Sequence, residues 1–184
     1  MKYWSKSTLT IYKYLSTMSK SIDRIIEENT KSSNSVALQR YQTTQYQANK
    51  IIDLIDRKRK MVNLKVIAED VVSRLKKSDR RIITLVFFDG IKSELVADML
   101  GISLRTFFRR KANALNQFTI ILEALGYDTE FFESEYFCER WFMSIYNNCV
   151  SKDYQSDTPL NKYLIKCMFN EISKVGAKFN LYLS

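Results

Sequence analysis

The sequence contains no histidine, and among its 184 residues glycine, proline and cysteine occur only four, one and three times. Without histidine, the chain lacks both the commonest general base and the commonest metal ligand of proteins. So few glycines and prolines cannot supply the tight turns of an all-β protein. Cys138, Cys149 and Cys167 are too widely spaced for a CxxC pair, and their odd number is typical of reduced, buried thiols. We therefore expect an all-α protein with no metal site and no cofactor.

The common signatures of enzymes are also missing. No glycine-rich loop precedes a Lys-Ser or Lys-Thr pair that would cradle a phosphate. Glu69 and Asp70, and the acidic residues at positions 130–139, have the spacing of surface charge rather than of a metal-binding cluster. Eleven tyrosines leave a tyrosine nucleophile open. The sequence therefore favours a protein that is not an enzyme, and we assign no catalytic residue.

Long apolar runs are absent as well. No uncharged apolar stretch reaches the roughly eighteen residues of a membrane span, and residues 1–6 (MKYWSK) do not begin a signal peptide. We expect a cytoplasmic protein with no membrane partner.

Charge is distributed unevenly along the chain, whose formal net charge is +9. Residues 57–111 contain fifteen Lys or Arg and six Asp or Glu, whereas residues 112–139 contain six acidic residues and no basic one. The first block would attract the phosphate backbone of DNA and the second would repel it, which predicts an oriented contact. A solvated lysine face without any partner would have the same charge, so charge alone does not establish a contact with DNA.

Hydrophobic periodicity predicts three helices in the N-terminal domain, residues 1–77. Apolar residues recur every three or four positions in residues 7–29, 36–57 and 63–77. The polar residues 30–35 (TKSSNS) are expected to link the first two helices into a hairpin, and the third helix continues the basic surface.

A helix-turn-helix unit is predicted in the central domain, residues 78–126. Ser78 or Asp79 is expected to cap a supporting helix at residues 80–89. The last helix of the unit is expected to run to a stop at Gly126.

The turn of the unit is centred on Gly101, which supplies a left-handed backbone conformation at little steric cost. Ala97 is small enough for the two helices to cross closely, and Ser103 is expected to cap the second helix near Thr106. The side chains that should point inward are Val96, Leu100, Ile102 and Phe107.

The outer face of the second helix is expected to enter the major groove of double-stranded DNA. Base edges would be contacted by Leu104, Arg105, Phe108 and Arg109, since bidentate arginine-to-guanine bonding is the commonest specific contact. Phosphates would be contacted by Ser103, Thr106, Arg57, Lys58, Arg59, Lys60, Arg80, Arg81, Arg110 and Lys111. Arg57 to Lys60 are expected at the end of the second N-terminal helix, where four consecutive cations exceed what the helix dipole requires.

This unit resembles the region 4 helix-turn-helix of bacterial sigma factors and of sigma-like regulators from phages and mobile elements. The resemblance covers residues 79–126 and rests on the helix at 80–89 ending in Asp89 and Gly90, on Leu95, Val96 and Ala97, on Leu100, Gly101, Ile102 and Ser103, and on Arg105, Thr106, Arg109, Ala114 and Leu115. Lys92 stands where the family usually places a Ser or Thr cap. Nothing in the chain matches the sigma domain that melts the minus-ten element. The resemblance implies transcription regulation with core RNA polymerase as a partner.

The C-terminal domain, residues 127–184, is predicted to be a small helical module for protein contact, through homodimerisation or docking on polymerase. It is rich in aromatic residues, and Thr158 and Pro159 are expected to begin its last helix.

Two other functions stay open. One is a phage DNA-packaging protein of the small terminase type, or an architectural DNA-binding protein. The other is an interaction protein whose helix-turn-helix docks on polymerase instead of DNA.

Overall fold

The computed structural model describes residues 2–33 and 44–151, which form seven α-helices, one π-helical segment and no strand. This confirms the all-α prediction. In chain order the elements are α1 (Tyr3–Ser33), α3 (Thr44–Arg74), α4 (Lys77–Ile83), the π-helical η1 (Thr84–Phe88), α5 (Ser93–Met99), α6 (Leu104–Ala124), α7 (Thr129–Glu135) and α8 (Arg140–Ser151).

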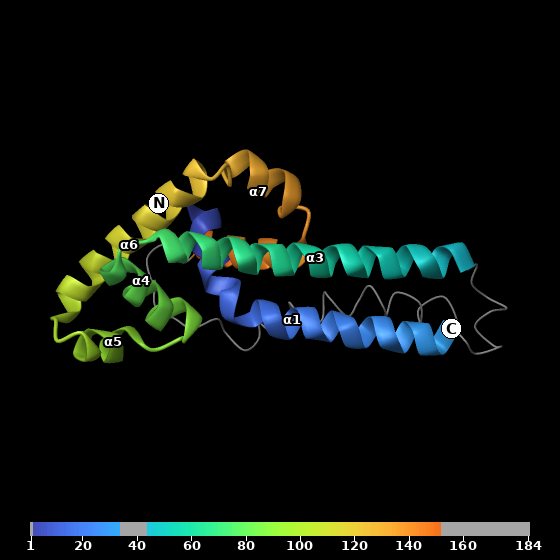
Figure 1. Ribbon diagram of the computed structural model, residues 1–184, viewed down its shortest axis with the longest axis horizontal. Coiled ribbons are helices and arrows are strands. Elements are labelled where there is room, and N and C mark those ends of the chain that lie inside the picture. Colours follow the sequence, from blue (N-terminus) through green and yellow to red (C-terminus); the bar gives the residue numbers. More distant parts are fainter. Residues whose placement is uncertain (1, 34–43, 152–184) are drawn as a thin grey trace.

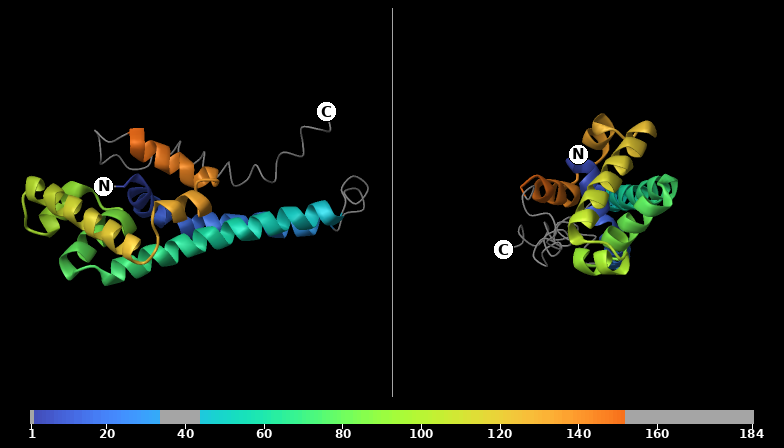
Figure 2. Two further views of the ribbon diagram at one scale, coloured as in Figure 1. Left: turned by 90° about the horizontal axis from the view of Figure 1, so that it is seen from above. Right: turned by 90° about the vertical axis from the view of Figure 1, so that its left-hand side faces the viewer.

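Two long helices, α1 and α3, lie antiparallel and side by side along the molecule (Figure 1). At the end where α3 finishes, the chain turns through α4, η1 and α5 into α6. From there α6 leads back to α7 and α8, and α8 packs on α1. Figure 2 shows α3 along one edge of the described structure and α8 near the opposite edge. The short helices at one end are therefore carried on a long helical pair.

The main hydrophobic core contains residues from α1, α3, α6, α7 and α8. At its aromatic end Trp4 stacks on Phe132 with 4.6 Å between ring centroids, and Phe132 in turn stacks on Phe142. Tyr136 and Trp141 complete this buried group. The first turns of α1 are thus packed against residues 127–151, the described part of the predicted C-terminal domain.

The helix boundaries predicted for the N-terminal domain were wrong in two places. α3 is one continuous helix through residues 58–62, where the sequence analysis placed a break, and α1 continues into the predicted linker as far as Ser33. Met61 continues the buried stripe between Leu54 and Leu64, and the half-buried Arg57 and Lys58 occupy the turn between Leu54 and Met61. No glycine or proline interrupts the helix there.

The start of the supporting helix also differs from the prediction. Lys76 occupies the N-cap position of α4 and makes no side-chain capping bond, so neither Ser78 nor Asp79 is the cap. At the other end the helix widens into η1, where the Asp89 amide donates to the Thr84 carbonyl at 2.9 Å.

η1 anchors the short helices to the long pair. The Phe88 ring stacks on Tyr12 of α1 with 3.5 Å between centroids, and the Tyr12 hydroxyl donates to Glu69 of α3 at 2.6 Å. Burial, together with the hydrogen bond to and the charge of Glu69, raises the pKa of Tyr12, so this hydroxyl keeps its proton and donates. One tyrosine thereby ties three elements together.

The structure tests only part of the predictions for the cysteines and for the last helix. Cys149 is buried as expected, but Cys138 is exposed, so the expectation of buried thiols fails there. Cys167 and the helix predicted from Thr158 and Pro159 lie outside the described residues.

Phe132 tests whether α7 and α8 fold together with the rest. Truncation in Phe132→Ala is expected to lower the free energy of unfolding by about 3–5 kcal/mol, because a fully buried ring is lost from a core shared by α1 and α7. Denaturant titration followed by circular dichroism should show one transition at a lower midpoint. Phe131→Ala, at a half-buried ring, is the control and should cost less. A separate early transition that leaves the remaining helices unchanged would mean that α7 and α8 form an independent unit.

Candidate nucleic-acid interface

The turn between α5 and α6 has the hydrogen bonds of a Schellman motif. The Ile102 amide donates to the Ala97 carbonyl at 3.1 Å, and the Gly101 amide donates to the Asp98 carbonyl at 3.0 Å. Gly101 has φ +63°, and nothing lies within 4 Å of the place where its Cβ would be. The left-handed backbone, and not crowding, therefore makes glycine the preferred residue at this turn, as predicted.

α6 begins with the predicted cap. The Ser103 hydroxyl accepts a bond from the Thr106 amide at 3.3 Å and donates to the Thr106 hydroxyl at 2.9 Å. The start of α5 is weaker, since Lys92 stands at its N-cap and makes no side-chain capping bond. The two hydroxyls at the start of α6 are thus engaged with each other, with Ser103 exposed and Thr106 half-buried.

A small second core holds α4, α5 and α6 together. It contains Ile82, Val96, Ala97 and Phe107 as buried residues, with Leu100 and Ile102 partly buried against them. Ala97 is 3% exposed, which agrees with its expected place where the two helices cross. The inward set predicted from the sequence is therefore the set that packs.

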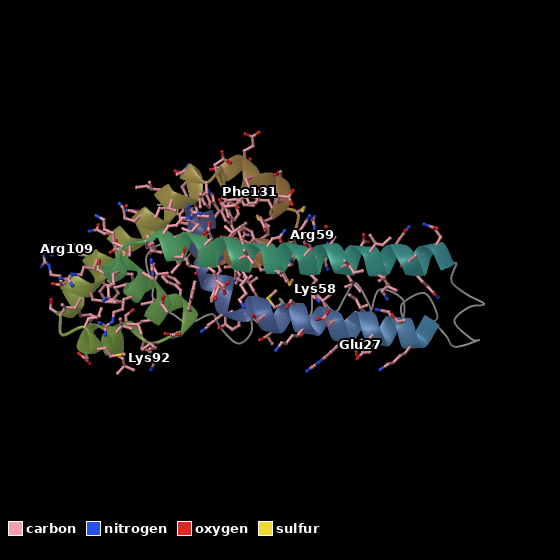
Figure 3. All side chains as sticks on the ribbon, in the orientation of Figure 1. Glu27, Lys58, Arg59, Lys92, Arg109 and Phe131 are labelled. Atoms are coloured by element: carbon pink, nitrogen blue, oxygen red, sulfur yellow. The ribbon has the colours of Figure 1, made fainter. Side chains whose placement is uncertain are left out.

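The outer face of α6 carries exposed arginines. Arg105, Arg109 and Arg110 are all exposed, and their guanidinium groups make no ion pair or hydrogen bond with any residue in the described ranges. Figure 3 shows Arg109 at the far end of the molecule, pointing away from the helices. Leu104 and Phe108 lie on the same face and are 41% and 38% exposed. All four side chains predicted to face base edges are therefore accessible.

α6 belongs to both hydrophobic cores. Its first half contributes Phe107 to the small core, and its second half contributes Ala114, Leu115, Phe118 and Leu122 to the main core. Lys111, between the halves, is only 8% exposed, with its ammonium group 5.8 Å from the ring centroids of Phe87 and Phe108. Cation–π contacts with these two rings stabilise the buried ammonium group of Lys111. Lys111 therefore does not belong to the exposed phosphate-binding set predicted from the sequence.

The basic run in α3 is engaged within the protein. Arg57 and Lys60 both reach the carboxylate of Glu139, at 3.1 and 3.2 Å, and the Trp141 indole donates to the same group at 2.9 Å. Glu139 is buried. Burial alone would lower the pKa of Lys60, but its hydrogen bond to Glu139 and the charge of that group outweigh burial and raise it. These two cations serve to hold a buried carboxylate.

The other members of the predicted phosphate set also have internal partners. Lys58 pairs with Asp23 of α1 at 2.6 Å, and Arg59 pairs with Asp56 one turn earlier in α3 at 2.6 Å. Arg80 donates to the carbonyls of Val72, Ser73 and Leu75 and so caps the end of α3. Figure 3 places Lys58 and Arg59 in the middle of the long helices, far from Arg109. Arg81 remains exposed on α4, beside α6.

The sequence carried no signal for the pairing of Arg57 and Lys60 with Glu139 or of Lys58 with Asp23. Glu139 lies 82 residues after Arg57, and Asp23 lies 35 residues before Lys58, so only the fold brings them together. Arg80 follows the last turn of α3 closely enough that a C-capping role could have been considered.

Comparisons with protein-family models, with curated proteins and with solved structures find no match to this chain. The likeness to sigma region 4 therefore rests on the residues quoted above.

Two general features of the described residues limit the chemistry of the site. No group of three or more His, Cys, Asp or Glu side chains within residues 2–33 and 44–151 is arranged to hold a metal ion. None of the helices in these ranges combines the length and apolar character that crossing a bilayer requires.

Gly101→Ala tests the turn that aims α6. The substitution should destabilise the protein by about 1–2 kcal/mol, because a Cβ strains the left-handed conformation although space is free around it. Gly101→Asn should cost less, since asparagine tolerates this conformation better than alanine. Chemical denaturation measures both. Equal stability of the alanine variant and the native protein would contradict the assigned turn.

Proposed function

We propose that the protein binds double-stranded DNA through the helix-turn-helix of α5 and α6 and acts as a transcription regulator of the sigma region 4 type. The observation that carries the proposal is the exposed trio Arg105, Arg109 and Arg110. These side chains have no internal partner among the described residues and project from a helix fixed by two hydrophobic cores. Long, unpaired cations on a rigid helix suit both phosphate neutralisation and bidentate base contact.

Roles within the interface follow from position and burial. Arg105 and Arg109, one turn apart, would contact base edges, with Leu104 and Phe108 beside them for apolar contact to a thymine methyl group. Arg110 and Arg81 would contact phosphates. Ser103 and Thr106 would stabilise the start of α6 and bind a phosphate oxygen with any hydrogen-bonding capacity left after their mutual bond. We leave Arg57–Lys60, Arg80 and Lys111 out of the proposed interface because each has a structural role.

Arg105→Ala tests base contact. Affinity for a duplex selected from a random pool should fall by about 1–3 kcal/mol, and preference should relax at one base position, whereas Arg81→Ala should weaken all duplexes alike. Fluorescence anisotropy at several salt concentrations measures both effects, and each lost phosphate contact should reduce the salt slope by roughly 0.9. Arg24→Ala, at an exposed arginine of α1, is the matched control and should change neither quantity.

The same titrations can reject the proposal. If native protein shows no salt-dependent binding to any duplex, α6 is not a DNA-binding helix. If Lys58→Ala weakens binding as much as Arg105→Ala, the basic run of α3 belongs in the interface despite its pairing with Asp23.

A second candidate function, docking on core RNA polymerase, is favoured by the outer face of α5. Leu95 and Met99 are 55% and 53% exposed there, flanked by the exposed acids Glu94 and Asp98. An apolar and acidic face repels phosphates but suits a protein surface with apolar and basic residues. The two faces of the unit would then bind different partners.

Leu95→Lys separates the two functions. It should reduce co-sedimentation with core polymerase while leaving affinity for the selected duplex at least as high, because it alters α5 and adds a cation. Equal polymerase binding by this variant and by native protein would remove the α5 face as a docking site.

A further inference from the structure

The outer face of α3 is apolar although α3 already packs on α1 with its inner face. Ile52, Ile55, Val62 and Val66 are 59%, 53%, 43% and 57% exposed. α1 has the same length, 31 residues, yet none of the exposed large hydrophobic residues of the described chain lies on it. A helix with apolar residues on two opposite faces is expected to be covered on both.

These four residues form one stripe, which we call the α3 stripe, with Arg59 at its centre. The positions 52, 55, 59, 62 and 66 follow the alternating spacing of three and four that characterises helix-to-helix seams. Leu54, Met61, Leu64 and Ala68 face the other way and are fully buried. The stripe thus has the pattern of a second packing seam along α3.

No described element lies over this seam. Figure 2 shows α3 along the edge of the described structure, with α8 near the opposite edge. Tyr136, which follows α7, donates its hydroxyl to the Lys60 carbonyl of α3, and Lys60 does not belong to the stripe. Within residues 2–33 and 44–151, the stripe is therefore uncovered.

We propose that the α3 stripe is a homodimer interface, on which α3 of a second copy lies antiparallel. A two-fold interface must be complementary to itself, and the stripe meets that condition. α3 spans Thr44–Arg74, so Asp56 and Arg59 lie near its midpoint, with the isoleucine pair on one side and the valine pair on the other. An antiparallel copy whose two-fold axis lies between Asp56 and Arg59 places Ile52 of each chain close to Val62 of its partner.

Charge at the centre supports the same arrangement. Arg59 and Asp56 are both exposed enough to interact across the seam, with side-chain exposures of 59% and 46%. With the two-fold axis between them, Arg59 of each chain meets Asp56 of the other, and the four charges alternate in sign. A parallel pair would instead set Arg59 against Arg59 and bring both arginine-rich α6 helices to the same end.

The size of the stripe sets the expected strength of the dimer. A 31-residue helix is ~46 Å long, and a contact strip ~10 Å wide along it covers on the order of 450 Å² per chain. A standard stable interface buries about 800 Å² per partner. The dimer is therefore expected to dissociate reversibly at micromolar concentration. It would place the two α5–α6 units at opposite ends, so that they contact separate DNA sites.

Analytical ultracentrifugation of the full chain over the micromolar range tests the proposal. Native protein should shift from monomer to dimer with concentration, and Ile55→Glu and Val62→Glu should each weaken the dimer at least about tenfold. Ile120→Glu is the matched control, since Ile120 is 55% exposed but lies on α6, and it should leave the dimer unchanged. Circular dichroism establishes that each variant is folded. A monomer at all concentrations, or equal loss in the control, would overturn the proposal.

A charge exchange tests the centre of the interface. Arg59→Glu and Asp56→Lys should each weaken self-association, because each homodimer then opposes like charges. An equimolar mixture of the two variants should recover the dimer. In the mixed dimer the introduced glutamate of the first variant meets the introduced lysine of the second, and the native Asp56 of the first meets the native Arg59 of the second. A mixture no better than its separate components would reject the cross-axis pairing.

Cross-linking tests the orientation. When an Ile52→Cys chain is mixed with a Val62→Cys chain and oxidised, peptide mapping should find the disulfide between positions 52 and 62. A dominant bond between two copies of position 52 would show that the helices run parallel. Because these experiments contain no DNA, their failure leaves the proposed DNA interface untouched, and a protein that fails to bind DNA can still pass them.

Discussion

The described structure depends on α6 being part of two hydrophobic cores. Phe107 closes the small core of α4, α5 and α6, while Phe118 and Leu122, further along the same helix, are fully buried in the main core. Because one rigid helix spans both, α5 and the start of α6 cannot reorient without breaking the packing of α6 against α1 and α3. The arginines at the start of α6 are thus held in fixed positions relative to the whole described molecule, which is the preorganisation that base recognition requires.

The cations of α3 and those on the outer face of α6 have different surroundings. In the middle of α3 they neutralise acidic groups, most clearly at Glu139, a buried carboxylate that would be costly without Arg57 and Lys60. On the outer face of α6 the arginines have no such partners among the described residues. Net charge therefore overstates the surface available to a polyanion, and the difference between paired and unpaired cations, rather than their density along the chain, supports the proposed interface on α6.

Local signals predicted the turn between α5 and α6 and its surroundings well. Gly101, Ser103 and the inward set around Phe107 act through residues close in sequence, so propensity and periodicity were enough to place the turn, the cap and the small core. Predictions from the sequence were wrong where long-range packing decides the structure. The charged run of α3 looked like a helix end because its stabilising partners, Asp23 and Glu139, lie elsewhere in the chain. Lys111 looked like a surface cation because nothing local shows that Phe87 and Phe108 enclose it.

The exposed stripe of α3 and the exposed face of α5 are the two surfaces proposed for contact with other protein chains. Each places large aliphatic side chains in water on a helix whose other face is buried, which monomeric proteins usually avoid when the patch is contiguous. The protein thus offers three outward faces of different chemistry. They are the cationic face of α6, the acidic and apolar face of α5, and the largely apolar stripe of α3.

The central claim, that DNA lies on the outer face of α6, is tested most directly by arginine-specific chemical modification with and without duplex DNA, read out by peptide mass spectrometry. The account predicts that DNA protects Arg105, Arg109 and Arg110, while the exposed Arg24 and Arg59 react equally in both samples. Unchanged reactivity on α6 together with protection of arginines in α3 would contradict it.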